Sequence, residues 1–524
     1  MIIDNTEFGR VEVRTLHLPE GLGSDVIGTY TYSGRVLVAV REPEKGKDWY
    51  RVFTVEDDGT GICELFSGEI PQKPGANGIR WMCYADNRRV LLGDYVLECC
   101  PDLDHCESSE LIDVVFPPEI SRIPRLFMRW SEPIIAPDNV HVCFSSLTAG
   151  NAFNFLGRLV RRENAYVMED VSVISTIDSL IPDPQDPGYY LPQIQRGGEV
   201  KQFVRGGRGI TLAGGGRSIS ESCLQMLDSE EVSFITDTLG YEETAILSPN
   251  EVYAVCMSPR FSPGTDAGVL GVVPLSGDLA TRGKYLNVLY QYAIAGVRSH
   301  RSGNIGPALI NVERSMKEGR GYMGVDLSDP EDKWVYYSPM SWHPDSTRAL
   351  WNERTRLNVG PVQCRLQICR LLDAAPSEPV SAAETPDSRD VPYARPITDA
   401  LKQEMPVFPL KIRGESGLVQ NAPVEGGAWE TRYEHYSEDG ETFYDGFIRV
   451  KAPTNMFRPG KTTIESDLTV TGAHQGQMKL RLEMYSDERF QIYPDFSADE
   501  NGQPKSFGFA EYDGLRREVS ELAP

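Results

Sequence analysis

Four side chains in this sequence are candidates for proton transfer. They are the adjacent carboxylates Glu242 and Glu243, in the stretch LGYEETAILSP, and the histidines His300 and His343. Carboxyl and imidazole groups act as general acids or bases when their surroundings bring the pKa close to the working pH. We therefore take these four residues as the candidate catalytic set.

A second set of charged residues could bind a substrate. Arginine holds a carboxylate through two parallel hydrogen bonds, which fixes an anion in position and orientation. Each of these residues could instead be solvated or paired with a neighbouring strand. The candidate substrate-binding residues are Arg80, Arg129, Glu132, Arg260 and Arg354.

The surroundings of His343 indicate a repeated structural unit. It lies in SWHPDSTRALWNE, where an apolar strand, a short turn with proline and aspartate, and a second apolar strand follow one another. Proline presets the first dihedral angle of such a turn, and Asp, Asn or Gly tolerates the tight positions after it, so the pattern predicts a β-hairpin. In sister copies the place of His343 is taken by Ser248 and Ala136, which favours a role in the turn over catalysis. The copies are ILSPNEVYAVCMS, IIAPDNVHVCFSS, WMCYADNRRVLLGD and, more faintly, TYTYSGRVLVAVRE.

The spacing of these turns predicts the fold. Consecutive clear copies are 53, 52, 112 and 95 residues apart, so the two long gaps could each hide one more copy. With both copies included the mean spacing is 52 residues, close to the length of a four-stranded propeller blade. We therefore expect an all-β protein with a six- or seven-bladed β-propeller over residues 10–373. The seven expected turn positions are Gly34, Asn87, Asn139, Gly207, Glu251, Gly303 and Ser346.

The repeat resembles that of the TolB-type propellers. The resemblance rests on the S-P-D-G-like turn after an apolar strand, followed by a strand and an Asp-Gly hairpin as in YRVFTVEDDGTGICELF, and it covers about residues 10–373. It implies a closed ring of mostly antiparallel blades around an axial channel. It implies no particular activity, because propellers serve as scaffolds, binding platforms and enzymes.

The sequence after the repeat changes in character. Residues 374–396 are rich in Pro, Ser, Ala and acidic residues, which is typical of a linker or an extended surface crossing. Residues 397–524 return to strand patterns and predict a small C-terminal β-rich appendage that could complete the ring with a strand. Within the repeat, LNVLYQYAIAGV fits either a helix or a buried pair of strands.

Charge and hydropathy exclude some partners. Acidic residues outnumber basic ones by 76 to 52, for a net charge of −24, and no basic cluster stands out, so we expect no nucleic acid partner. The apolar run AGVLGVVPL is far shorter than the roughly 20 residues that span a bilayer. The start, MIIDNTEFGRVEV, lacks the positive charge and apolar core of a secretory signal. We therefore expect a cytoplasmic protein with no membrane partner.

The ten cysteines are scattered, which fits reduced thiols in the cytosol better than a disulfide framework. In LECCPDLDHC, Cys99, Cys100, His105 and Cys106 could be placed around zinc, but adjacent cysteines on an extended chain point to opposite faces. We expect no metal and no cofactor. A G-x-S-x-G nucleophile motif is also absent from the sequence.

Two functional hypotheses remain. The first is a propeller enzyme (a lyase, hydrolase or isomerase) or binding protein whose axial pocket takes an anionic or sugar-like small molecule, with Arg anchoring and Glu/His acid–base chemistry. The second is a non-catalytic scaffold that binds a protein partner through its rim loops.

Overall fold

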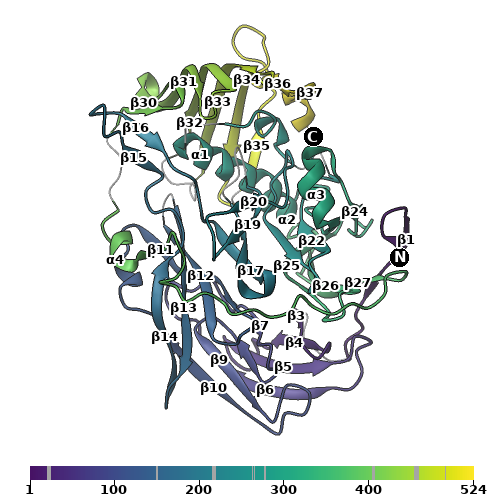
Figure 1. Cartoon of the computed structure of the whole chain (residues 1–524). Coiled ribbons are helices and arrows are strands. Elements are labelled where there is room, and N and C mark those ends of the chain that lie inside the picture. The colour runs from purple at the N-terminus through teal and green to yellow at the C-terminus, as the bar shows by residue number, and fades with distance from the viewer. Residues whose placement is uncertain are drawn as a thin grey trace.

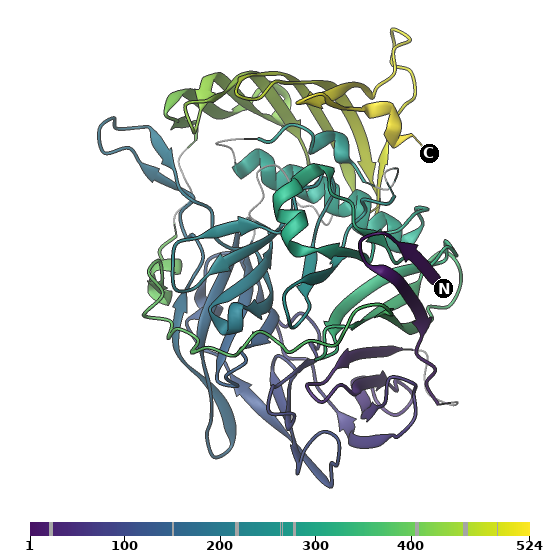
Figure 2. The same cartoon turned by 45° about the vertical axis from the view of Figure 1, so that its right-hand side comes forward.

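Strand pairing arranges this chain as a β-propeller that carries a separate C-terminal sheet (Figures 1 and 2). The computed structural model describes residues 1–19, 25–148, 151–214, 220–262, 264, 266–275, 279–403, 408–453, 459–489 and 491–523. Within these ranges, antiparallel sheets form the blades of the propeller. The predicted all-β fold with a C-terminal β-rich appendage is therefore confirmed.

Six four-stranded units can be traced among the described residues. The first three are β3 (Val26–Tyr30), β4 (Val36–Arg41), β5 (Trp49–Val55) and β6 (Cys63–Glu69); β7 (Met82–Cys83), β8 (Arg89–Leu91), β9 (Tyr95–Cys100) and β10 (Ser108–Val115); and β11 (Leu126–Ile135), β12 (His141–Thr148), β13 (Asn151–Arg161) and β14 (Ala165–Val173). The next two are β17 (Glu199–Val204), β18 (Gly209–Ala213), β19 (Ser222–Met226) and β20 (Val232–Phe234); and β21 (Thr244–Leu247), β22 (Tyr253–Met257), β23 (Ala308–Asn311) and β24 (Val325–Asp326). We call these units blades 1 to 5 in chain order.

Blade 6 closes the ring with a strand from the N-terminus. Its strands are β25 (Trp334–Trp342), β26 (Arg348–Thr355), β27 (Cys364–Leu371) and β2 (Gly9–Thr15), with β1 (Ile2–Asn5) at the edge. Val11 of β2 pairs with Leu371 of β27. The expectation that residues 397–524 complete the ring is therefore wrong among the described residues, because β2 already occupies that edge.

The middle strands of the blades are apolar on both faces because both faces are buried. In β4, Val36 and Val38 pack with residues of blade 6, whereas Leu37 and Ala39 pack with residues of blade 2. Successive side chains of a strand point to opposite faces. A continuous apolar run therefore joins each blade to both of its neighbours.

Six of the seven predicted turns lie between the first and second strands of a blade. Four of them place a non-glycine residue in the left-handed region, with φ of 55° at Asn87, 64° at Asn139, 58° at Glu251 and 64° at Ser346. Gly303 does not belong to this set, because it lies between β22 and β23 of blade 5. The 95-residue gap before Ser346 is thus one blade with a long insertion, not two blades.

The insertion in blade 5 is helical. It contains η4 (Gly268–Leu270), α1 (Leu279–Leu289), the π-helix η5 (Tyr290–Ala295) and α2 (Gly296–Ser299), and α3 (Val312–Glu318) with η6 (Gly319–Gly321) follows β23. LNVLYQYAIAGV is therefore a helix, and its apolar residues form one core cluster with the C-terminal sheet. The hydroxyl of Tyr292 donates to the carbonyl of Leu522 at 3.1 Å. In Figure 1 the insertion lies between the blades and this sheet.

The C-terminal strands form one antiparallel sheet, extended at its edge by a hairpin that leaves the propeller after blade 3. The hairpin consists of β15 (Leu180–Pro182) and β16 (Tyr190–Pro192), and β16 pairs with β29. The remaining elements are β29 (Leu410–Arg413), β30 (Ser416–Val424), η7 (Glu425–Gly427), β31 (Ala428–Ser437), β32 (Thr442–Lys451), β33 (Gly460–Gly472), β34 (Gly476–Ser486), β35 (Ile492–Pro494), β36 (Phe507–Tyr512), β37 (Leu515–Glu518) and η8 (Val519–Leu522).

The segment between the two parts crosses the blade turns. Backbone amides of Ser377, Val380 and Ala383 donate in turn to the carbonyls of Asp345, Pro249 and Gly206, which lie in the turns of blades 6, 5 and 4. The segment then reaches blade 3, where β28 (Arg395–Pro396) pairs with β14 and is followed by α4 (Ile397–Ala400). The short helix η1 (Ile120–Arg122) lies in the chain between blades 2 and 3. Of the two predicted alternatives, the residues follow a surface crossing. The division at residues 373 and 397 remains our proposal for the domain boundaries.

No helix among the described residues is long and apolar enough to cross a membrane.

Candidate functional site

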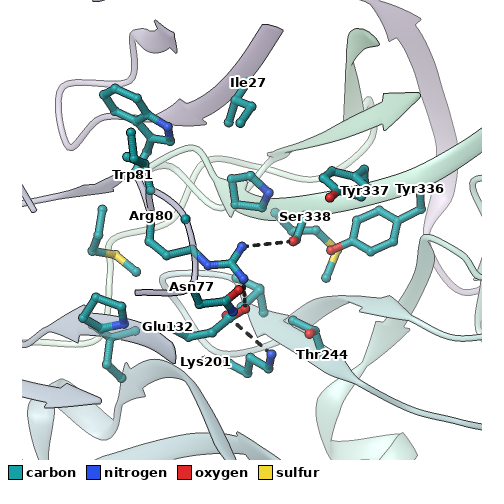
Figure 3. A pocket seen from close by; sticks show the side chains of 18 residues that line it. Ile27, Asn77, Arg80, Trp81, Glu132, Lys201, Thr244, Tyr336, Tyr337 and Ser338 are labelled. Carbon is teal, nitrogen blue, oxygen red and sulfur yellow. Dashed lines mark hydrogen bonds and ion pairs between the residues drawn. The ribbon is translucent and has the colours of Figure 1, made fainter. Parts of the chain in front are cut away.

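A cavity of about 290 Å³ lies on the propeller axis, and every blade contributes to its wall (Figure 3). We call it the axial pocket. Small-molecule sites typically measure about 300–1,000 Å³, so its volume suits a small ligand. One residue from each blade, in blade order, is Ile27, Arg80, Glu132, Lys201, Thr244 and Pro339.

Opposite charges alternate across the axial pocket. Arg80 lies 3.0 Å from Glu132, and Glu132 lies 3.4 Å from the ammonium of Lys201. Lys201 also lies 3.1 Å from Glu199 and 3.9 Å from Glu243. These carboxylates raise the pKa of Lys201 although its burial opposes that shift. One buried cation therefore holds carboxylates from three blades together.

Irregular backbone directs two of these side chains toward the axis. Glu132 has a φ of 51°, and the pairing of β11 with β12 shifts register between Ser131 and Ile134. Lys201 lies where β17 shifts register against β18, between Val200 and Gln202. Such bulges turn a side chain out of the regular alternation of a strand. The two irregularities thus bring opposite charges to the same cavity.

Hydrogen bonds behind the pocket fix the carboxylate of Glu199. The hydroxyl of Ser131 donates to Glu199 Oε1 at 2.7 Å, and Asn77 Nδ2 donates to Ser131 Oγ at 3.2 Å. These bonds connect blades 2, 3 and 4. Glu199 is therefore held in place and has little freedom to move toward a ligand.

Three polar atoms at the axial pocket are buried and have no hydrogen-bond partner among the described residues. They are the Tyr336 hydroxyl and Arg80 Nε, whose residues line the pocket, and Glu243 Oε2, whose residue lies beside it without lining it. Buried polar groups are bonded in the great majority of cases, so an unbonded group in a cavity wall indicates a ligand contact. In Figure 3 the Tyr336 hydroxyl points inward from the wall opposite Trp81. The Tyr336 hydroxyl and Arg80 Nε are therefore the groups of the pocket wall that the protein leaves available for a ligand.

Burial also changes the acid–base properties of Glu243. Burial raises the pKa of Glu243 above its ordinary value, while Lys201 and the guanidinium of Arg298 oppose the rise. A carboxyl group with a raised pKa can hold a proton near neutral pH and exchange it with a ligand. Of the four candidate catalytic residues, Glu243 is the one beside the axial pocket.

Glu242 faces away from Glu243 into another environment, as adjacent residues of an extended chain do. Glu242 is fully buried and forms an ion pair with Arg260 at 3.1 Å. Its Oε1 atom also accepts bonds from the hydroxyls of Thr238 and Ser258. Glu242 and Arg260 therefore form a buried pair inside blade 5 and do not line the axial pocket.

Arg129 and His300 also lie elsewhere. Arg129 donates to Asp94 at 2.5 Å and lies over the ring of Phe116, between blades 2 and 3. His300 packs against Tyr493 of β35, with ring centroids 5.1 Å apart, at the contact with the C-terminal sheet. Neither of these two residues lines the axial pocket.

His343 lies in the turn of blade 6, as its place in the repeat predicted. Its backbone amide donates to the carbonyl of Arg348, and its Nδ1 atom lies 2.9 Å from Asp345 Oδ1. Arg348 NH2 approaches the Nε2 atom at 2.8 Å. The side chain is thus engaged in the turn, and it does not line the axial pocket.

Arg354 lies beside the axial pocket, in an adjoining cavity of about 430 Å³. Its guanidinium carbon is 3.9 Å from the centroid of the Tyr337 ring. Ile27 and Tyr337 line both cavities. Of the predicted substrate-binding residues, Arg80 and Glu132 line the axial pocket, and Arg354 lines the adjoining cavity.

The sequence contained a signal for the pocket that the candidate set did not use. In five blades the residue seven positions before the turn lines the axial pocket: Ile27, Arg80, Glu132, Thr244 and Pro339. Lys201, Glu199, Tyr336 and Arg298 were missed. In blade 4 the register shift near Val200 displaces the pattern by one residue, so Lys201 stands six positions before Gly207.

Comparison with known proteins gives structural matches only. No family model and no curated protein matches the chain. Among solved structures, a TolB-type protein from Agrobacterium tumefaciens is 10% identical, with 58% of this chain and 79% of that chain covered and a TM-score of 0.31. TolB from Acinetobacter baumannii is 13% identical, with 66% and 65% covered and a TM-score of 0.30. A protein of unknown function from Dyadobacter fermentans is 11% identical, with 69% and 99% covered and a TM-score of 0.33.

TolB structures are thus among the solved structures to which this chain is similar. The chain spans 65% of the Acinetobacter protein, slightly less than two thirds of its length. The strand pairing itself establishes the propeller, and we argue function from the axial pocket alone.

Proposed function

We propose that the axial pocket binds a small molecule that carries an anionic group and hydroxyl groups, such as a sugar acid or a small hydroxy acid. One observation carries the proposal. All six blades line one cavity, and in its wall the Tyr336 hydroxyl and Arg80 Nε are buried without a partner among the described residues.

Arg80 suits the anionic group of this ligand. It pairs with Glu132, but its second terminal nitrogen has only a 3.5 Å contact with Ser338 Oγ. A bond that long is weak, so this nitrogen and Nε can turn to a carboxylate. The Tyr336 hydroxyl can donate to or accept from a ligand hydroxyl on the opposite wall.

The other walls suit the carbon skeleton of a sugar-like molecule. Trp81, Tyr336 and Tyr337 supply aromatic surface, and Met82 and Met340 supply flexible apolar surface. Ligand sites are mostly apolar with a few placed polar groups, and the axial pocket follows that pattern.

Glu243 is the proposed acid–base residue if the ligand is also a substrate. Its raised pKa favours a protonated carboxyl that can protonate a leaving or enolic oxygen, and Lys201 can stabilise the carboxylate that remains. With this role of Glu243, the axial pocket would be the active site of a lyase, hydrolase or isomerase. His300 and His343 have no part in it. A cytoplasmic location also belongs to this proposal, supported by ten cysteines that are all free thiols.

A second candidate is the protein-interaction scaffold. One observation favours it: Leu357, Val359 and Val362, in the loop between β26 and β27, are 52%, 52% and 38% exposed. Exposed apolar side chains close together are typical of protein contacts. This candidate takes precedence if the axial pocket binds no small molecule.

Binding measurements on the full-length protein test the proposal. Gluconate, galacturonate and citrate are compared with glucose by thermal unfolding, and acids that raise the melting temperature are then titrated calorimetrically. We expect Arg80→Met and Tyr336→Phe to weaken binding of the stabilising acid by about tenfold or more. Tyr84→Phe is the matched control, because its hydroxyl is also buried and has no hydrogen-bond partner in the described part of the chain, but lies outside the axial pocket. The proposal fails if no acid stabilises the wild type, or if both pocket variants bind like the control.

A further inference from the structure

We infer that Arg298 and Arg354 form an oxyanion subsite beside the axial pocket, suited to a phosphate or carboxylate group. The inference rests on the proposed function in one respect: the subsite would hold a second acidic group of the ligand bound in the axial pocket. The contacts of the two arginines with the Tyr337 ring do not depend on that ligand.

Both guanidinium groups are held at one aromatic ring. The Cζ atom of Arg298, from α2, lies 4.7 Å from the centroid of the Tyr337 ring, and that of Arg354, from the end of β26, lies 3.9 Å from it. Cation–π contact holds a guanidinium in place but leaves its positive charge uncompensated. Two elements far apart in the sequence thus bring two cations to the same ring.

Neither guanidinium forms an ion pair in the described part of the chain, although Arg298 is close enough to Glu243 to oppose the rise of that pKa. No carboxylate there lies within 4.0 Å of either group, and the Nε atoms of Arg298 and Arg354 are buried without a hydrogen-bond partner. Arg80, by contrast, pairs with Glu132 at 3.0 Å. Planar guanidinium groups are preferred for binding carboxylate and phosphate because their donors match the oxygens in pairs. The two arginines therefore present unused donors of the kind that such oxyanions need.

The carboxylates that line the adjoining cavity do not neutralise this pair. Glu353 is 1% exposed and committed to Arg365 at 2.6 Å and to the indole of Trp351 at 3.0 Å. Asp25 is exposed and forms no ion pair with Arg354 within 4.0 Å. Burial lowers the pKa of Arg354 and the like charge of Arg298 adds to that effect, while Tyr337 and Asp25 oppose it. A bound anion would relieve this repulsion.

Room for an anion exists beside Arg354, in a cavity whose lining includes Arg354 but not Arg298. The adjoining cavity, about 430 Å³ in volume, is lined by Arg354, Arg41 and Asn352 and shares Ile27 and Tyr337 with the axial pocket. A group bound at Arg354 is thus separated from the axial pocket by the ring of Tyr337. A ligand with two acidic groups that reaches around this ring could contact Arg80 at one end and Arg354 at the other.

Titration of the full-length protein with inorganic phosphate and with malonate tests the subsite. Chloride keeps the ionic strength constant, so that a general salt effect is removed. We expect both probes to bind the wild type and to raise its melting temperature, and the tighter of the two identifies the preferred oxyanion. Arg298→Met and Arg354→Met should each weaken that binding by about tenfold or more.

Two controls accompany these variants. Arg41→Met removes an arginine from the same cavity whose guanidinium already donates to the Lys47 carbonyl at 2.7 Å, and it should bind the probes normally. Without probe, Arg354→Met should be at least as stable as the wild type, since it removes a buried charge that lacks a partner.

Loss of phosphate or malonate binding in Arg298→Met and Arg354→Met, with Arg41→Met unaffected, supports the subsite whether or not a sugar acid binds the axial pocket. No binding of either probe to the wild type overturns the subsite and leaves the proposed function to its own test. Equal loss in Arg41→Met also overturns it, because the anion then binds in the cavity without needing the two arginines at the Tyr337 ring.

Discussion

Lys201 and Glu243 lie 3.9 Å apart on the propeller axis although they belong to neighbouring blades. The side chain of Lys201 is 2% exposed, so its ammonium has almost no contact with water. It also meets Glu132 and Glu199 of blades 3 and 4. An ammonium removed from water is tolerated only with close carboxylates, and these carboxylates in turn depend on the ammonium. Charge, more than apolar packing, therefore joins these blades at the axis.

Lys201→Met should destabilise the protein strongly at neutral pH. It leaves Glu132, Glu199 and Glu243 close together and without their shared cation, and breaking such a buried pair costs about 3–5 kcal/mol. The pKa of Lys201 is raised in the folded state. The stabilisation of the fold by the Lys201 charge is therefore fully present below the pKa of lysine in the unfolded state, near 10.4, and is lost only as the pH rises above that value. Urea unfolding at pH 7.5 measures the loss.

The loss should shrink at pH 5, because Glu243, whose pKa is raised by burial, can then take up a proton. Lys402→Met is the control: Lys402 is 76% exposed, and its contact with Asp399 is 3.6 Å long, so we expect a change within about 0.5 kcal/mol. Similar stability of the two variants at pH 7.5 would contradict the central role of Lys201.

Asp266 should make the protein less stable as the pH rises from about 4 to 7. Burial raises the pKa of Asp266 to about 7, and Oδ1 has no hydrogen-bond partner among the described residues. Between the unfolded value near 3.9 and the folded value, the folded state binds more protons than the unfolded state, so stability falls with rising pH. Over that interval the contribution amounts to about 3–4 kcal/mol.

Asp266→Asn removes this pH dependence and keeps an acceptor for the Tyr241 amide, which donates to Oδ2 at 2.5 Å. We expect the variant to exceed the wild type in unfolding free energy at pH 7.5 and not at pH 4. Asp467→Asn, at a position 64% exposed, should follow the wild type at both values. A parallel pH profile for wild type and Asp266→Asn would rule out an effect of Asp266.

The propeller could be predicted because its strongest signal is local. A turn such as that at Asn139 depends on the few residues around it, and Asn, Asp and Gly tolerate positive φ wherever they occur. The prediction of a blade turn at Gly303 was wrong because the helical insertion of blade 5 is about as long as a missing blade would be. Ring closure by β2 could not be inferred from spacing, because pairing of Val11 with Leu371 joins the two ends of the array.

The candidate site could be predicted only in part. Arg80 and Glu132 precede a recognised turn by seven residues, so their blade position was readable from the sequence. Whether Glu242 or Glu243 faces the axis depends on the exact start of β21, and Lys201 is placed by a register shift in β17. Arg298 comes from the insertion, where no repeat defines a position. These placements depend on tertiary pairing that local patterns do not encode.

Val11→Ala should weaken the whole propeller, not only its edge. Val11 of β2 is fully buried. It belongs to the core cluster that also contains residues of blade 6, of the blade 5 insertion and of the C-terminal sheet. Truncating a buried valine removes apolar contact and leaves a cavity, so we expect a loss of about 2 kcal/mol in unfolding free energy. Val115→Ala, at a position 46% exposed, is the matched control and should change the stability little.

Because β2 closes the ring, the transition in Val11→Ala should remain a single one by both tryptophan fluorescence and far-ultraviolet circular dichroism. An early separate transition with most of the signal retained would show that β2 frays independently, and closure would then contribute little.

His343 should matter for the stability of the blade 6 turn and not for ligand binding. Its Nε2 atom lies against the turn of blade 1, where a Cβ added at Gly34 would come within 2.3 Å of it. Burial and the charge of Arg348 lower the pKa of His343, so the folded state binds fewer protons than the unfolded state and stability falls as the pH drops through about 6.5.

In His343→Asn this part of the pH dependence should disappear, while loss of the contacts with Asp345 and Arg348 costs about 1–2 kcal/mol at pH 7.5. Urea unfolding at pH 5.5 and 7.5 measures both effects, and calorimetry with the acid that stabilises the wild type measures binding. Intact binding with reduced stability supports the turn role, whereas a tenfold loss of affinity in a variant that is folded at pH 7.5 would return His343 to the catalytic candidates.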